Sequence, residues 1–161
     1  MKVNRKKKFL LHKSNPLIIL KVMLTSPRSW AALVISGKNL DIDEISEILK
    51  NEPDYFHSSL KDPKTKEAIP AIWQLNSKLP DDQILESHLW EILKKIASSR
   101  DELRKIAKRH TVTFYCSIEK TDMNTKGFKL SPRIMTLLGS LGVSMEVNLW
   151  QEDNSNKISI L

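Results

Sequence analysis

Two segments of this chain alternate strictly between apolar and polar side chains, and this pattern constrains the fold more than any other feature. In residues 111–119 and in residues 143–150, the large apolar side chains fall at every second position. Successive side chains of a β-strand point to opposite faces of the sheet, so each segment predicts a strand with one buried and one wet face. A parallel sheet covered on both faces would give continuous apolar runs instead. The pattern therefore favours a sheet with helices packed on one face only.

The segments between and before these strands predict the remaining elements. Residues 30–36 (WAALVIS) and 71–77 (AIWQLNS) are typical of strands, and a short strand is expected at residues 128–130. The element order is strand, helix, strand, helix pair, strand, short strand, helix and strand. We predict an α+β fold, namely a two-layer sandwich with a mostly antiparallel, ferredoxin-like sheet and with helices packed on one face.

Helix boundaries follow from capping residues. Asp41 is expected to accept from free backbone N–H groups at the start of one helix. Ser131 precedes Pro132, whose fixed φ suits the first position of the last helix. A long helix is expected to begin near Asp81–Asp82, and its apolar stripe is interrupted at Ser98–Ser99. We therefore expect two consecutive helices there, or one helix with a kink.

The length and composition are those of a single globular domain. The chain has 161 residues and is 40% hydrophobic, and a domain of about 150 residues buries roughly 68–70% of its unfolded surface. We predict a basic, disordered or weakly ordered leader at 1–29, one domain at 30–150 and a polar tail at 151–161. A single cysteine, Cys116, excludes an internal disulfide and a cysteine-based zinc site, and we expect a cytoplasmic protein.

The net charge of +7 describes the leader and not the domain. Eight of the 26 Lys and Arg residues lie in residues 1–29, which hold no acidic residue, so 18 basic residues face 19 acidic ones in the rest. Attraction to phosphates needs a clustered basic face, which this composition does not imply. The apolar run at residues 17–24 is too short to span a bilayer, so no transmembrane segment is expected. Contact of the leader with an anionic membrane surface and translation from Met23 are alternatives.

Several motifs occur in an order that resembles a known family. A strand that ends at Gly37 is followed by the motifs LDIDEISEIL (40–49), EPD (52–54), LNSKL after Trp73, HLWEILKKI (88–96) and GFKLSPRIMTLLGSLGVSMEV (127–147). This order and spacing are similar to those of the bacterial family catalogued as domain of unknown function 4279, from about Trp30 to Trp150. The resemblance implies the family's fold and a bacterial or phage origin. It supplies no mechanism, because the family has no established activity.

The reactive side chains of this chain form no recognisable catalytic motif in the sequence. The chain has no Gly-rich phosphate loop, nucleophile elbow or paired-carboxylate motif. Cys116 is expected in the core, and His88 on a solvated or half-buried helix face. We therefore predict no catalytic residue, no metal site and no cofactor. The sequence favours a protein without enzyme activity but does not decide this point. One alternative is a hydrolase that uses His57, in a loop near Asp54, as an acid–base residue.

The wet face of the predicted sheet carries the candidate binding residues. Alternation places Tyr115, Trp150, Asn148 and Thr113 on this face. Exposed aromatic patches more often mark protein contacts, although such rings also stack on RNA bases. We predict a non-catalytic protein-interaction module with an unidentified protein partner. The alternative is a nucleic-acid-binding protein that uses this face and the basic leader. The tail, the leader or a second copy covering the rings is a further alternative, and no feature assigns an oligomeric state.

Overall fold

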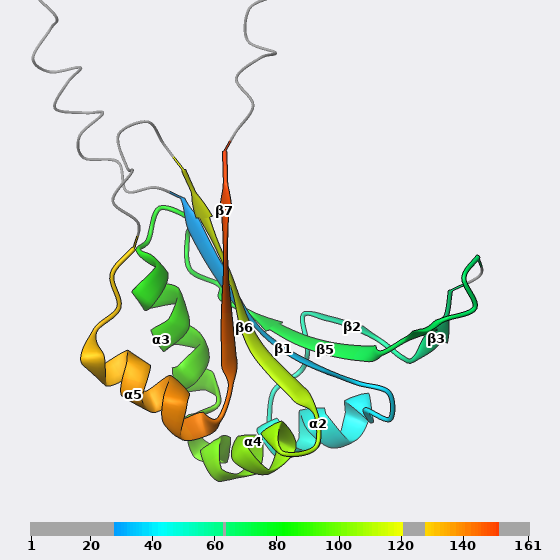
Figure 1. The fold of residues 1–161 in the computed structure, drawn as a ribbon. Coiled ribbons are helices and arrows are strands. Elements are labelled where there is room, and N and C mark those ends of the chain that lie inside the picture. Colours follow the sequence, from blue (N-terminus) through cyan, green and yellow to red (C-terminus); the bar gives the residue numbers. More distant parts are fainter. Residues whose placement is uncertain (1–27, 63, 121–127, 152–161) are drawn as a thin grey trace, which may run out of the picture.

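A mixed sheet of five strands forms the centre of the molecule (Figure 1). The computed structural model describes residues 28–62, 64–120 and 128–151. The strands of the sheet are β1 (Ser29–Gly37), β2 (Tyr55–His57), β5 (Ala71–Asn76), β6 (Thr111–Glu119) and β7 (Ser144–Trp150). A separate small hairpin consists of β3 (Leu60–Lys61) and β4 (Ala68–Ile69). The helices are α2 (Ile42–Leu49), α3 (Leu85–Lys95), the 3-10 turn η1 (Ala97–Ser99), α4 (Arg100–Ala107) and α5 (Pro132–Leu141).

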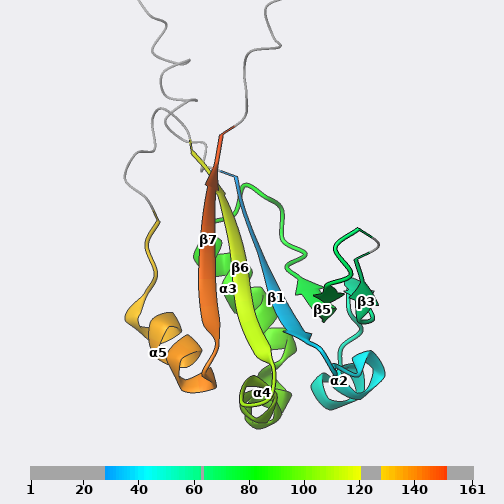
Figure 2. The ribbon, with the colours of Figure 1, turned by 45° about the vertical axis from the view of Figure 1, so that its right-hand side comes forward.

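The sheet is mostly antiparallel, as the alternation predicted. Its strand order is β2-β5-β1-β6-β7. The central strand β1 pairs antiparallel with β5 and with β6, and β2 pairs antiparallel with β5. Only β6 and β7 pair in parallel among these strands, and α5 connects them (Figure 2). This order differs from the β-α-β-β-α-β order of a ferredoxin-like domain, so the narrower assignment is not confirmed.

The helices lie on one side of the sheet in both views (Figures 1 and 2). They bury the inward side chains of the central strands, such as Leu33, Trp73 and Phe114, each 0% exposed. The helical faces supply the other half of the core, including Leu89 and Ile92 of α3. The described residues place no helix on the opposite face of the sheet. The surface of that face is therefore formed by the side chains of the strands.

The predicted helix caps are confirmed. Asp41 accepts hydrogen bonds from the backbone N–H groups of Asp43 and Glu44 at 3.0 and 3.1 Å, which satisfies donors that the first turn leaves free. The hydroxyl oxygen of Ser131 accepts from the Ile134 N–H at the start of α5. Gly142 ends α5 with a φ of 68°, a left-handed conformation that glycine adopts without strain.

Several expected boundaries were wrong. The long helix begins at Leu85 and not near Asp81, because residues 80–84 form a turn before it. Residues 128–130 form no strand. The element order expected from the sequence had no strand between the first helix and residues 71–77, but β2, β3 and β4 lie there. Leu149 was expected inward but is 62% exposed.

Some expectations concern residues outside the described part of the chain. These are the leader up to residue 27, the loop at 122–127 and the tail from residue 152. The proposed division into leader, domain and tail therefore stays a prediction. Within the described segments, no helix combines the length and the apolar character needed to cross a bilayer.

Candidate functional site

The helix-free face of the sheet, which we call the open face, aligns polar and aromatic side chains across three strands. Ser117 of β6 lies opposite Trp30 of β1 and opposite Asn148 of β7. Two positions further back along β6, Tyr115 lies between Ala32 and Glu146. Directly opposite residues in adjacent strands have Cβ atoms about 4.5–5.5 Å apart, so these rows form one continuous surface.

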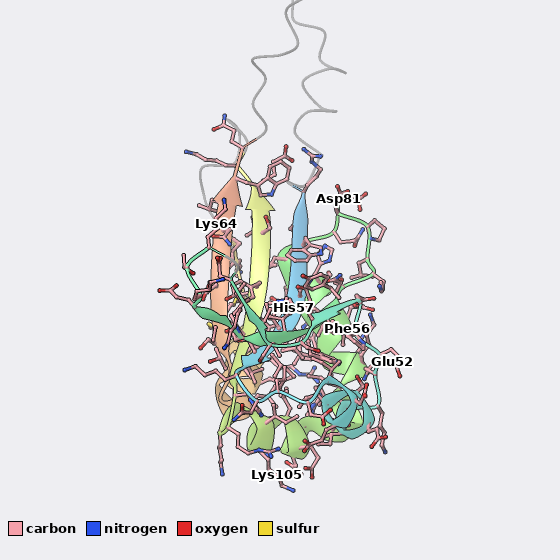
Figure 3. The ribbon with its side chains drawn as sticks, turned by 90° about the vertical axis from the view of Figure 1, so that its right-hand side faces the viewer. Glu52, Phe56, His57, Lys64, Asp81 and Lys105 are labelled. Carbon is pink, nitrogen blue, oxygen red and sulfur yellow. The ribbon has the colours of Figure 1, made fainter. Side chains whose placement is uncertain are left out.

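A cavity of about 400 Å³ opens at one end of this face, between the two tryptophans. It is lined by Arg28, Ser29, Trp30, Asp81, Ser117 and Trp150. The turn before α3 closes one side, because the Ser29 N–H donates to the Asp81 carbonyl oxygen at 2.7 Å. Figure 3 shows Asp81 close to the start of β1. The cavity therefore combines aromatic walls with hydroxyl and charged groups.

Arg28 organises the charged rim of this cavity. Its Nε and Nη2 atoms donate to the two carboxylate oxygens of Glu119 at 3.1 and 3.0 Å. The same guanidinium lies 4.8 Å from the ring centroid of Trp150, within the range of cation–π attraction. Hydrogen bonding by Arg28 holds the pKa of Glu119 below its ordinary value. The pair fixes the position of the Trp150 ring and neutralises the Glu119 charge.

The structure places the predicted sheet residues on one face but does not expose all of them. Tyr115 and Trp150 are half-buried and Asn148 is exposed, in accordance with the alternation. The exposure expected for Thr113 was wrong, because this residue is only 3% exposed. Thr113 lies in the interior of the sheet, opposite Val34 of β1 on one side and opposite Ser144 of β7 on the other.

Trp30 belongs to this site, although the sequence reasoning did not select it. Its side chain is 38% exposed and lines the cavity. The continuous apolar run WAALVIS concealed it, since such a run is typical of a strand buried on both faces. Counting by twos from the buried Leu33 would have placed Trp30 on the face opposite Ala31 and Leu33.

His57 lies in the edge strand β2, away from the tryptophan cavity (Figure 3). It pairs with Ile72, and its Nδ1 atom lies 3.0 Å from the Ser58 carbonyl oxygen. Its ring meets the Tyr55 ring edge-on at 6.0 Å between centroids. No hydrogen bond joins His57 to Asp54 among the described residues. The structure thus brings His57 neither to the cavity nor to a carboxylate.

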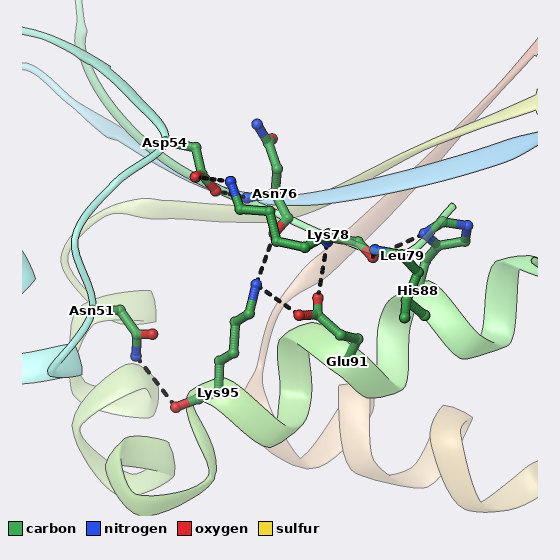
Figure 4. Close-up of polar contacts among 9 residues, drawn as sticks. Asn51, Asp54, Asn76, Lys78, Leu79, His88, Glu91 and Lys95 are labelled. Atoms are coloured by element: carbon green, nitrogen blue, oxygen red, sulfur yellow. Dashed lines mark hydrogen bonds and ion pairs between the residues drawn. The ribbon is translucent and has the colours of Figure 1, made fainter. Parts of the chain in front are cut away.

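Asp54 belongs to a polar network at the end of β5 (Figure 4). Its carboxylate accepts from the Asn76 N–H at 2.7 Å and from the Lys78 ammonium. Burial alone would raise the pKa of Asp54, but hydrogen bonds from Lys78 and Asn76 and the nearby lysine charges outweigh it and lower this pKa. Lys95 of α3 bonds to the Asn76 carbonyl oxygen and to Glu91. The network joins the sheet edge to α3 and explains the EPD motif structurally.

The remaining reactive groups have structural surroundings. Cys116 is 1% exposed, and burial raises the pKa of its thiol to about 12, so a nucleophilic thiolate does not form at neutral pH. His88 was expected on a solvated or half-buried face, but it is 0% exposed. The described residues contain no group of three or more His, Cys, Asp or Glu side chains arranged to hold a metal ion.

Comparison with known proteins assigns the family. A family model described as Domain of unknown function (DUF4279) matches residues 26–152, which is most of the chain. The chain therefore belongs to this family, and the resemblance seen in its motifs is confirmed. No curated protein and no solved structure matches the chain.

Proposed function

We propose that this chain is a non-catalytic protein-interaction module that binds a protein partner with the open face of its sheet. The observation that carries the proposal is a cavity of about 400 Å³ lined by Trp30 and Trp150, with the half-buried Tyr115 two positions from Ser117 on the same face. Buried aromatic anchors dominate the binding energy of protein interfaces. Large apolar side chains on a surface without a helical cover favour such a contact.

The geometry of the cavity supports binding by insertion of a partner side chain. Trp30 and Trp150 supply apolar walls, and Ser117, which lies opposite Trp30 in the strand register, also lines the cavity. Arg28 holds Trp150 in place before any partner arrives. An ordered side chain loses little conformational entropy on binding, which favours affinity.

The charges around the cluster favour a protein over a nucleic acid. Glu146 lies opposite Tyr115, and Asp81 lines the cavity. Arg28 is already paired with Glu119, so it adds little net positive charge. Carboxylates beside the rings repel phosphates, whereas nucleic-acid-binding sheets combine stacking rings with basic side chains. Binding of nucleic acid through the open face and the basic leader is the alternative function, and a cytoplasmic location is part of the proposal.

A capture experiment with two variants tests the proposal. The tagged full chain, the double variant Trp30→Ala/Tyr115→Ala and the control Met135→Ala are compared in extracts of the cells that encode the protein. Met135 is 54% exposed on α5, on the helical side. We expect one protein that wild type and Met135→Ala retain and the double variant loses. With the purified partner, calorimetry should give an affinity loss of at least about 30-fold for the double variant.

Two results would contradict this function. One is an identical set of captured proteins for all three chains while circular dichroism shows them folded. The other is tight binding of a labelled single-stranded oligonucleotide that survives Lys6→Gln/Lys7→Gln/Lys8→Gln and disappears in the double variant. That second result would establish the nucleic-acid alternative.

A further inference from the structure

A second cavity, of about 420 Å³, lies on the helical side, between α3, α4 and α5. Figure 1 shows these three helices together on the side of the sheet opposite the open face. Trp90 of α3, Arg100 of α4 and Arg133 of α5 line the cavity, together with the hydroxyl-bearing residues Thr136 and Ser140. Two guanidinium groups beside hydroxyl groups are the donor set that binds oxyanions in proteins.

Arg100 has no partner within the described residues. Its Nε atom is buried and makes no hydrogen bond. No ion pair involves this guanidinium, although a positive charge in a half-buried position is costly unless a counter-charge or hydrogen bonds compensate it. The lining of the cavity contains no carboxylate that would serve. The buried Nε–H donor of Arg100 is therefore unsatisfied among the described residues.

Arg133 is held in place by an aromatic ring and not by an acid. Its guanidinium carbon lies 5.0 Å from the ring centroid of Trp90. Stacking on an aromatic face orders a guanidinium while leaving its N–H groups free to bind a planar or tetrahedral oxyanion. Like Arg100, it makes no ion pair with a described carboxylate.

The carboxylates on the neighbouring helices are engaged elsewhere. Glu86 accepts hydrogen bonds from the N–H and the hydroxyl of Ser131 at 2.8 and 2.7 Å. Asp101 pairs with Arg104 at 2.6 Å, and Glu102 pairs with Lys105 at 2.8 Å. Asp101 and Glu102 are therefore paired with other cations. Glu86 also accepts from the Trp90 indole N–H at 3.3 Å, and none of its hydrogen bonds involves Arg100 or Arg133.

We propose that the cavity between α3, α4 and α5 is a binding site for a small oxyanion, a phosphate or carboxylate group, held by Arg100 and Arg133. Trp90 then provides an apolar wall for the part of the ligand that carries the anion, and the Thr136 hydroxyl is available as a further donor. This site is separate from the open face and does not depend on the proposed protein interaction.

A titration of the full chain with inorganic phosphate tests the proposal. Nuclear magnetic resonance at constant ionic strength follows the indole N–H signal of Trp90 and the backbone N–H signals of Trp90, Thr136 and Ser140. We expect saturable shifts with a dissociation constant on the order of 1 mM. A parallel titration with acetate distinguishes a phosphate ligand from a carboxylate ligand. Stronger binding of phosphate assigns a phosphate ligand, and stronger binding of acetate assigns a carboxylate ligand.

Three Arg→Gln variants that each remove one positive charge distinguish binding in the cavity from non-specific electrostatic attraction of the anion to the protein. Arg133→Gln and Arg100→Gln should each weaken binding by about tenfold or more, since a charge-assisted hydrogen bond contributes about 1.5–3 kcal/mol. Arg109→Gln is the control, because Arg109 lies 56% exposed beside Glu44 and outside the cavity. It should change binding by less than about twofold. Arg133 is exposed, so its variant remains informative if Arg100→Gln does not fold. No saturable shift with either anion, or equal weakening in Arg133→Gln and Arg109→Gln, would overturn the proposal.

Discussion

Replacing Trp73 with alanine will lower the free energy of unfolding by about 3–5 kcal/mol, the range for large-to-small changes of buried aromatic residues. Trp73 is 0% exposed on the inward face of β5, where α2 covers it. Its indole Nε1–H donates to the Ser46 hydroxyl of α2 at 3.0 Å. The substitution removes both the apolar contact area and this hydrogen bond, which join α2 to the sheet. Urea unfolding followed by circular dichroism measures the effect.

Two companion variants divide this loss into its parts. Ser46→Ala removes the acceptor and also the hydrogen bond that the Ser46 hydroxyl donates to the Ile42 carbonyl oxygen. It should cost about 1–3 kcal/mol, because the indole N–H remains buried without a partner. Trp73→Phe keeps most of the packing and should cost less than Trp73→Ala. A loss below about 1 kcal/mol for Trp73→Ala would show that α2 does not pack on β5 as described.

Acidification below pH 6.5 will destabilise the protein through His88. Burial lowers the pKa of His88 below its ordinary value of 6.5. The hydrogen bond to the Gln83 backbone and the carboxylates of Glu91 and Asp81 offset only part of this effect. Nδ1 lies 2.8 Å from the Ser77 hydroxyl oxygen, and Nε2 is buried without a hydrogen-bond partner among the described residues. An imidazolium would place a positive charge in the core, which burial disfavours.

The sign of this effect follows from proton linkage. The folded-state pKa is lower, so the unfolded chain takes up the proton first as the pH falls. The contribution of His88 to the free energy of unfolding is fully present above pH 6.5. As the pH falls further, it decreases by up to about 1.4 kcal/mol per pH unit until the folded-state pKa is reached. The lowered pKa values of Asp54 and Glu119 act in the same direction, but only near and below their ordinary values of 3.8 and 4.5. The interval above about pH 5 therefore isolates the histidine.

Urea unfolding between about pH 7 and about pH 5 measures this slope. His88→Asn is the control, since its amide reaches the Ser77 hydroxyl but does not titrate, and its stability should be flat across the interval. Direct titration of the His88 ring signal in the wild-type protein keeps the test valid if the variant does not fold. A His88 pKa at or above 6.5 would contradict the account.

The parts of the fold that local chemistry determines were predictable from the sequence. The alternation around Phe114 identified β6, and the caps Asp41 and Ser131 located the starts of α2 and α5. Each signal lies within a few neighbouring residues, and no distant contact opposes it. Recognition of the family depended on the order of these same motifs.

The parts that depend on distant contacts were not predictable. The strand β2 has only three residues, and β5 fixes its position through Asp54 and Asn76. The burial of His88 depends on Ser77, which is remote from its own helical turn. The cavity is lined by Trp30 of β1 and Trp150 of β7, which are far apart in the sequence. No local pattern predicted that these two residues would line one cavity. The open face was therefore predicted as a surface, while its cavity was not.

The most direct test of the central claim, that helices cover one face of the sheet and leave the other open, compares two adjacent positions on β6. Cys116 points to the helices and is 1% exposed, whereas Ser117 lines the open-face cavity. Alkylation by iodoacetamide, followed by mass spectrometry, is measured for the wild-type protein and for the variant Cys116→Ala/Ser117→Cys. The account predicts that Cys116 reacts only after unfolding, and that the cysteine at 117 reacts in the folded protein at least about 100-fold faster. Equal rates at the two positions, or faster reaction of Cys116, would contradict it.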